Sequence, residues 1–273
     1  MKNIEKESGC LILAGGQGTR LGCQGAKGCV ELPVKPPKSL FQILLEKVKN
    51  RHAHIAMMTS PENHQQTQNY MDRQGWFGLK NINLFTQETI NGIPNGNGKA
   101  FRSFFRSGLY AKWVEKGIKY LQVLPIDNPL AELFDHEMLN LNQGNELVLR
   151  GVKRINSKEK IGVIIEGETL KVIEYTQGEF CDLNLLGNTG LFSCTMDYVK
   201  RVYNTEIPFS IVKKKTKNGW VSKKEYFIFD LFPFAKTYKV LFSEREKVFS
   251  PVKNSCGLNS LDTAAKAFMT LNQ

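Results

Sequence analysis

LAGGQGTRLG fills residues 13–22, directly after the apolar run 10–13, and this stretch decides the fold that we expect. A short apolar strand that runs into glycines can bring bare backbone N–H groups against a phosphate, because no side chain keeps the ligand away. Thr19 adds a hydroxyl and Arg20 adds a guanidinium with fixed donors. The stretch therefore predicts a strand-to-loop unit that binds a nucleoside triphosphate.

Two well-known phosphate-binding motifs do not fit this loop. The dinucleotide motif needs G-x-G-x-x-G, whereas Gly16, Gly18 and Gly22 are spaced G-x-G-x-x-x-G. The P-loop needs a glycine before its lysine and a hydroxyl residue after it, but Lys27 lies between alanine and glycine. A glycine-rich turn without a ligand is the plain alternative. It is disfavoured because one turn seldom needs four glycines together with Thr and Arg.

The length and composition indicate one large α/β domain, residues 1–273, with a core that needs no disulfides. The six cysteines form no CxxC pair and the four histidines have no metal-site spacing, so we expect buried thiols in a reducing compartment. The charged start, residues 1–9, lacks the apolar segment of a signal peptide, and no later run approaches the roughly 20 apolar residues of a membrane span. We therefore expect a soluble, cytoplasmic protein.

A net charge of +11 suits anionic partners such as nucleotides, phosphosugars, nucleic acid or a membrane surface. The densest basic segment, residues 213–217 with Lys223 and Lys224, has one interleaved aromatic and no repeat. Such a segment is more typical of a solvated hairpin or loop than of an RNA-binding strip. We expect neither a nucleic-acid nor a membrane partner.

Short apolar runs alternate with helical patterns in the first half of the chain, as in a mostly parallel sheet. The expected strands are residues 10–13, 55–58, 82–85 and 120–124. Ser39 and Gln42 are expected to form a capping box at the start of one helix, and Ser60 is expected to cap another with Pro61 at its first position. A longer amphipathic helix is expected over residues 99–115.

After about residue 145 the pattern changes to paired strands. They are residues 146–152, 161–166 and 170–175, the last two joined by a turn at Gly167. We expect an antiparallel extension that carries a second substrate.

Polar or glycine residues follow each strand of the first half. They are residues 15–20, Thr59, Gln87 and Asp127. Ligands of open α/β sheets bind at the carboxyl ends of the strands, so we expect these residues to converge on one site.

Five further segments make the glycine loop specific. They are AKG at 26–28, IPNGNGK at 93–99, PIDN at 125–128, GNTGLF at 187–192, and the run from EYFIFDLFPFAK at 225–236 to FSPVKN at 249–254. In this order and spacing, from residue 13 to about 271, the chain resembles the UDP-N-acetylglucosamine pyrophosphorylase group of UDP-sugar uridylyltransferases. The chain resembles a short, core-only version, with Ala26 where the family has proline.

The resemblance implies a Rossmann-like nucleotide-diphospho-sugar transferase (GT-A-like) fold of three layers. Its central sheet would be mixed and mostly parallel, with an antiparallel sugar-binding extension. Residues 1–145 would form the nucleotide-binding half and residues 146–273 the sugar-binding half of a single catalytic domain, for which a monomer is favoured.

Site residues follow from the same resemblance. Arg20, Lys27 and Lys253 would be catalytic. The nucleotide would be bound by Leu13, Ala14, Gly15, Gly16, Gly18, Thr19, Lys27, Gln87, Gly96, Asp127 and Lys223. The sugar would be bound by Asn97, Glu174, Asn188, Phe227, Phe229 and Lys253. Asp127 would also hold the cofactor, Mg²⁺, since carboxylate oxygens suit this ion.

The implied reaction condenses UTP with N-acetylglucosamine 1-phosphate to UDP-N-acetylglucosamine and pyrophosphate. Three alternatives stay open at this point. They are a UDP-glucose or broad-specificity UDP-sugar pyrophosphorylase, a glycosyltransferase of related fold, and a basic binding protein without activity.

Overall fold

The computed structural model describes residues 4–23, 25–49, 51, 53–90, 93–216 and 219–272. Seven strands of its largest sheet are β1 (Ser8–Leu13), β4 (His54–Thr59), β5 (Ile82–Thr86), β8 (Tyr120–Pro125), β9 (Leu147–Val152), β12 (Gly187–Thr195) and β15 (Tyr238–Ser243). They lie side by side in the order β15-β9-β12-β8-β1-β4-β5, and only β12 runs against its neighbours. This confirms the mixed, mostly parallel sheet.

The second half of the chain differs in part from the expectation. A hairpin of β10 (Val163–Ile165) and β11 (Lys171–Ile173) forms the expected antiparallel extension and joins β12 at Gly187. Strand β9 was expected beside that hairpin, which is wrong: it pairs with β12 and β15 in the main sheet. Strands β12 and β15 are far from β9 in sequence, so no local pattern indicates this pairing.

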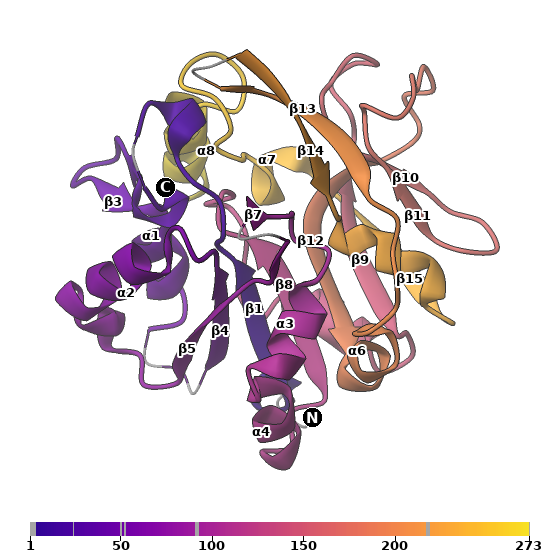
Figure 1. Cartoon of the computed structure of the whole chain (residues 1–273), viewed down its shortest axis with the longest axis horizontal. Helices are drawn as coiled ribbons and strands as arrows, with labels where there is room; N and C mark the ends of the chain where they lie inside the picture. Colours follow the sequence, from indigo (N-terminus) through magenta and orange to yellow (C-terminus); the bar gives the residue numbers. More distant parts are fainter. Residues whose placement is uncertain are drawn as a thin grey trace.

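Helices cover both faces of the sheet (Figure 1). Leu11 of β1 shares a core cluster with α3 (Ala100–Arg106), α4 (Leu109–Glu115) and α6 (Met196–Val202). Its neighbours Cys10 and Ile12 share the other cluster with α1 (Leu40–Glu46), α2 (His64–Arg73) and α8 (Leu261–Leu271). Successive residues of a strand point to opposite faces, so this alternation produces the three-layer arrangement.

The remaining elements are short. The helices are α5 (His136–Leu141) and α7 (Arg245–Val248), with 3₁₀ turns at Ile4–Glu7, Thr19–Leu21, Lys27–Cys29, Gly75–Gly78 and Ile228–Phe234. The two-stranded sheets are β2 (Glu31–Leu32) with β3 (Lys38–Ser39), β6 (Thr89–Ile90) with β7 (Ile93–Pro94), and β13 (Ser210–Thr216) with β14 (Gly219–Glu225). The last pair confirms a hairpin at the basic segment. Among the described residues, no helix has the length and apolar character needed to cross a membrane.

Helix boundaries depart from the predictions at two places. The single helix expected over residues 99–115 is wrong, because Gly108, at φ +77°, ends the turn between α3 and α4. Ser60 does not cap α2, which begins at His64; the Ser60 N–H instead donates to Asn63 Oδ1 at 2.8 Å. The cap at Ser39 is confirmed, since its hydroxyl accepts from the Gln42 N–H at 3.0 Å, but the Gln42 side chain bonds to Glu46 and does not complete a capping box.

Gly9 of β1 packs directly against the ring of Trp113. A Cβ atom at Gly9 would lie 2.2 Å from a ring carbon of Trp113, which is itself 1% exposed. Replacing Gly9 by alanine is expected to lower the free energy of unfolding by about 1–3 kcal/mol, because the buried indole must shift. Urea unfolding would measure the loss. Gly144→Ala is the control, since a Cβ there meets no atom within 4 Å; equal losses in both variants would contradict the packing argument.

Candidate active site

A two-part cleft lies at the carboxyl ends of β1, β5 and β8. Its larger cavity, about 480 Å³, is lined by residues that include Gly15, Gly16, Gln17, Thr19, Met58, Glu62, Gln87, Gly96 and Glu225. A smaller cavity of about 210 Å³ adjoins it. Leu13, Asn97, Pro125 and Phe227 line both cavities. Two ligand groups bound in them would therefore lie next to each other.

The glycine loop forms one wall of the larger cavity. Within the described part of the chain, the N–H groups of Gly15 and Gly16 have no hydrogen-bond acceptor, so they remain available to an anion. The loop then folds back on itself: the Gly18 N–H donates to Gly25 O at 2.9 Å, and the Lys27 N–H donates to Gly16 O at 3.1 Å. These bonds fix the loop before any ligand arrives.

Asn63 supports this loop from beneath and was missed by the sequence analysis. Its side chain is fully buried, and its Nδ2 donates to the carbonyls of Ala14 at 2.9 Å and Gly16 at 3.1 Å. Its Oδ1 accepts from the Ser60 N–H. Only the closeness of an Asn to a strand end could have indicated this role.

Gln87 brings an amide to the other side of the larger cavity. Its Oε1 would lie 2.9 Å from a Cβ atom at Gly15, so the glycine permits this close approach. Gly96, at φ +91°, passes still closer to Tyr226, whose carbonyl oxygen would lie 2.4 Å from a Cβ atom at Gly96. An amide offers a donor and an acceptor together, as the edge of a pyrimidine base requires.

Lys27 and Asp127 meet beside the smaller cavity. Lys27 Nζ lies 3.2 Å from Asp127 Oδ2 and donates to Val252 O at 3.1 Å, and the Val252 N–H donates to Asp127 O at 2.8 Å. The Lys27 and Asp127 side chains are 17% and 18% exposed. Three segments that are far apart in sequence thus share one polar junction. Asp127 lines the smaller cavity, whereas Lys27 lines neither cavity.

The structure brings together all six residues predicted to bind sugar. They line the smaller cavity and are Asn97, Glu174, Asn188, Phe227, Phe229 and Lys253. Asn97 Oδ1 accepts from the Ile228 N–H at 3.1 Å, and Asn188 Oδ1 accepts from the Gly190 N–H at 3.1 Å. Each bond orients an amide and leaves its NH₂ group for a ligand hydroxyl. The rings of Phe227 and Phe229 stack with their centroids 4.9 Å apart.

Glu174 and Lys253, whose charges are opposite in sign, both line this cavity. Burial raises the pKa of the Glu174 carboxyl, while the positive charge of Lys253 lowers it and Asp230 raises it. Burial also raises the pKa of Asp230 to about 6, although the Phe227 backbone opposes that shift. Lys160 lines the cavity too, and sequence analysis missed it because a lysine in a loop carries no local signal.

Other predicted residues lie elsewhere. Within the loop, Ala14 and Gly18 are buried and Arg20 is exposed; none of the three lines either cavity. Leu13, Gly15, Gly16, Thr19, Gln87 and Gly96 do line the larger one. Lys223 belongs to β14, and its side chain lies outside the described residues.

The donor set for a metal ion is small. The described ranges contain no group of three His, Cys, Asp or Glu side chains that could hold one. Asp127 Oδ2 contacts Lys27, but Oδ1 has no partner among the described residues, so a single carboxylate oxygen is available. This fits an ion such as Mg²⁺, which takes one or two carboxylates and completes its shell with phosphate oxygens and water.

The chain is similar to known uridylyltransferases and UDP-N-acetylglucosamine pyrophosphorylases. The model of the UTP–glucose-1-phosphate uridylyltransferase family matches residues 6–259. UDP-N-acetylglucosamine diphosphorylase 2 of Arabidopsis thaliana is 30% identical over 93% of this chain, which spans 62% of that protein. UDP-N-acetylglucosamine pyrophosphorylase of Saccharomyces cerevisiae is 30% identical over 97% of this chain and 69% of its own length.

A solved structure has the same fold. The uridine diphosphate N-acetylglucosamine pyrophosphorylase of Trypanosoma brucei, crystallised with an inhibitor, superposes with a TM-score of 0.86 at 24% identity. The superposition covers 98% of this chain and 66% of that one. The chain thus spans less than two thirds of the Arabidopsis relative and about two thirds of the trypanosomal enzyme.

Proposed function

This chain belongs to the UTP–glucose-1-phosphate uridylyltransferase family, and we propose that it joins UTP to N-acetylglucosamine 1-phosphate, releasing pyrophosphate. One observation carries the proposal: a glycine-loop cavity with an amide adjoins a second cavity lined by all six predicted sugar contacts. Residues 1–145 would supply most of the first cavity, and residues 146–273 most of the second.

The reaction needs alignment more than acid–base chemistry. A phosphate oxygen of the sugar 1-phosphate attacks the α-phosphorus of UTP, the bond to the bridging oxygen breaks, and pyrophosphate leaves with that oxygen. The attacking phosphate is already anionic at neutral pH, so no general base is required. The site must hold the two reactants in line and offset their negative charge.

The chain's own groups are suited to that task. The N–H groups of Gly15 and Gly16, which have no acceptor among the described residues, can hold the triphosphate, and Gln87 can pair with uracil. Lys27, which contacts Asp127, and Lys253, which lines the same cavity as Asp127, can supply positive charge. Mg²⁺, when held by Asp127 and the phosphates, would neutralise further charge on the transferring group.

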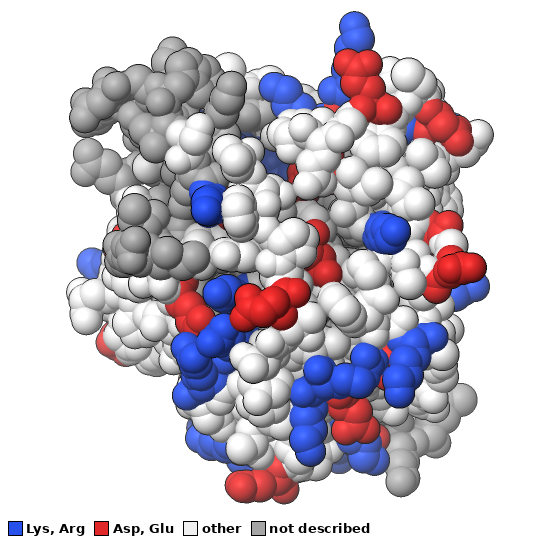
Figure 2. All heavy atoms as spheres, turned by 45° about the vertical axis from the view of Figure 1, so that its right-hand side comes forward, with Lys and Arg blue, Asp and Glu red and all other residues white. Residues whose placement is uncertain are grey.

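One face of the molecule carries charges of both signs. On the face drawn in Figure 2, Lys and Arg side chains gather toward the lower part, with Asp and Glu side chains among them. Such mixed charge differs from the basic stripe typical of nucleic-acid binding. This face therefore favours a small-molecule partner.

All six cysteines are free thiols, which supports the cytoplasmic location that we propose.

A panel of sugar 1-phosphates tests the proposal. The purified chain with UTP and Mg²⁺ is expected to release pyrophosphate faster with N-acetylglucosamine 1-phosphate than with the N-acetylgalactosamine or glucose analogue, and chelation of the metal should stop release. Pyrophosphate production coupled to phosphate detection would be measured, with the sugar phosphate left out as a control. Highest rates with glucose 1-phosphate would move the assignment to UDP-glucose synthesis. Release of UDP instead of pyrophosphate would contradict uridylyl transfer.

A further inference from the structure

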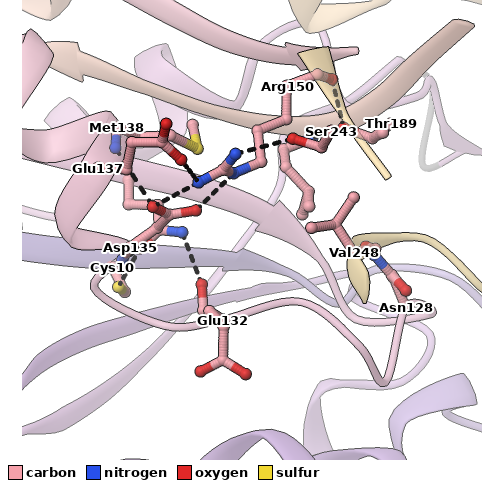
Figure 3. A network of polar contacts seen from close by, with 12 residues as sticks. Cys10, Asn128, Glu132, Asp135, Glu137, Met138, Arg150, Thr189, Ser243 and Val248 are labelled. Atoms are coloured by element: carbon pink, nitrogen blue, oxygen red, sulfur yellow. Dashed lines mark hydrogen bonds and ion pairs between the residues drawn. The ribbon is translucent and has the colours of Figure 1, made fainter. Parts of the chain in front are cut away.

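Asn128 connects two segments that are far apart in the sequence. Its side chain is fully buried; Nδ2 donates to Val248 O at 2.7 Å, and Oδ1 accepts from the Ser250 N–H at 3.1 Å. Oδ1 also accepts from the Leu130 N–H at 3.3 Å. Figure 3 shows Asn128 beside Val248, where the two segments meet. Both ends of one amide therefore hold the chain at the end of α7.

The segment that Asn128 holds carries part of the active site. Phe249, Pro251 and Lys253 line the smaller cavity, and Val252 accepts the hydrogen bond from the Lys27 ammonium. Asn128 itself lines neither cavity, so it is not placed to touch a substrate there. Its neighbour Asp127 does line the smaller cavity.

We propose that Asn128 is a positioning residue, which sets Lys253 at a fixed place relative to Asp127 and the sugar phosphate. This inference rests on the proposed function. Four ties fix the segment near Lys253: the Asn128 amide, the bond from Lys27 Nζ to Val252 O, the bond from the Val252 N–H to Asp127 O, and the bond from the Lys253 N–H to Asn259 O. Two of them depend on a side chain, and of these two residues only Asn128 lies outside the proposed catalytic groups. A single substitution can therefore loosen the segment without altering any lining residue.

The chemistry of the amide makes Asn128→Asp an informative change. A carboxylate can still accept from the Ser250 and Leu130 N–H groups, but it cannot donate to Val248 O. An oxygen would then face a carbonyl oxygen, and the buried Val248 O would lose its donor. Loss of a buried hydrogen bond lowers the free energy of unfolding most when one partner, here Val248 O, stays buried without a donor.

The expected kinetic effect is selective. In Asn128→Asp, the KM for the sugar 1-phosphate is expected to rise about tenfold and kcat to fall about tenfold, because the segment no longer holds Lys253 in place. The KM for UTP should stay within about twofold, since the glycine loop and Gln87 are held by other residues. Steady-state kinetics with each substrate varied in turn would separate the two values.

Asn142 offers a matched control. It is also a buried asparagine, 3% exposed, and its Nδ2 donates to Asn145 O at 3.1 Å and Ser193 O at 3.4 Å, away from both cavities. Asn142→Asp is expected to reduce thermal stability without changing the ratio of the two KM values. If Asn128→Asp raised both KM values equally, or behaved like Asn142→Asp, the positioning role would be overturned.

A readout without turnover separates this inference from the proposed function. Amide hydrogen exchange in the unliganded protein should become at least about tenfold faster at Ser250 and Val252 in Asn128→Asp, with no change at Gly18 or Lys27. Unchanged exchange at residues 248–254 would overturn the positioning role even in an active enzyme. If exchange became faster in Asn128→Asp but the unsubstituted protein formed no UDP-sugar, the proposed function would be refuted. The hold of Asn128 on residues 248–254 would still stand.

Discussion

Turnover of the proposed uridylyl transfer is expected to fall by about 10²–10³-fold when Lys27 is replaced by alanine. The ammonium lies at the junction of three segments, 3.2 Å from Asp127 Oδ2 and 3.1 Å from Val252 O. Its positive charge would offset the charge of the phosphates in a site that is only partly open to water, where such interactions are stronger than in bulk solvent. The KM for UTP should change much less than kcat.

Lys47 provides a control with the same types of bonding partner, although its carboxylate partner is 60% exposed. It too is 17% exposed, and its Nζ contacts one carboxylate and one carbonyl, those of Glu132 at 3.0 Å and Ala131 at 2.8 Å. It lines neither cavity. Lys47→Ala is expected to lose a similar amount of stability and to keep nearly wild-type turnover.

The comparison distinguishes chemistry from folding. Rates would be measured under saturating substrates, and thermal unfolding would be followed for both variants by circular dichroism. Turnover in Lys27→Ala within threefold of wild type, or an equal loss of turnover in Lys47→Ala, would remove Lys27 from the mechanism. Lys27→Arg should recover only part of the rate, because the guanidinium is larger and planar.

The sequence predicted the parts of this fold that depend on local patterns. The four parallel strands of the first half are apolar runs that end in glycine or polar residues, so both their positions and the convergence of Gly15, Gln87 and Asp127 could be inferred. The hairpin around Gly167 has the same kind of local signal.

What the sequence could not predict depends on contacts between distant residues. Asn63 precedes the first residue of α2, and its side chain bonds to the Ser60 N–H and to the glycine loop 47 residues earlier and does not cap the helix. The pairing of β9 with β15 and the contact of Lys27 with Val252, 225 residues away, leave no trace in either local sequence. The sugar cavity could be predicted only through the family resemblance, because its residues come from separate strands, loops and a 3₁₀ turn.

Arg150 forms a largely buried ion pair with Asp135, and breaking it is expected to cost about 3–5 kcal/mol of stability. Its guanidinium bonds both oxygens of Asp135, at 2.6 and 2.8 Å, and also Glu137 at 2.7 Å and Ser243 at 2.8 Å (Figure 3). The Arg150 and Asp135 side chains are 10% and 12% exposed. Burial lowers the pKa of Arg150, but the bonds and charges of Asp135 and Glu137 outweigh it and raise the pKa above its ordinary value.

The variant Arg150→Met tests this pair by removing the cation and keeping most of the volume. Asp135 is then left buried with an unpaired charge, which is the main source of the loss. Adding Asp135→Asn should restore at least half of the lost stability, since asparagine has no charge and can still accept from the Met138 N–H, as Asp135 does at 3.2 Å to cap α5. Urea unfolding of the two single variants and the double variant would give the coupling energy.

An exposed ion pair supplies the comparison. Lys247 and Glu244 lie 2.9 Å apart and are 63% and 62% exposed, so Lys247→Met should cost less than about 1 kcal/mol. If Arg150→Met lowered the free energy of unfolding no more than Lys247→Met, burial would not explain the stability of the Arg150 ion pair. If the double variant lost the full sum of the single losses, the two groups would not be coupled. Because the Arg150 carbonyl also accepts from Thr189 beside Asn188, the destabilised variants should also weaken sugar-phosphate binding more than UTP binding.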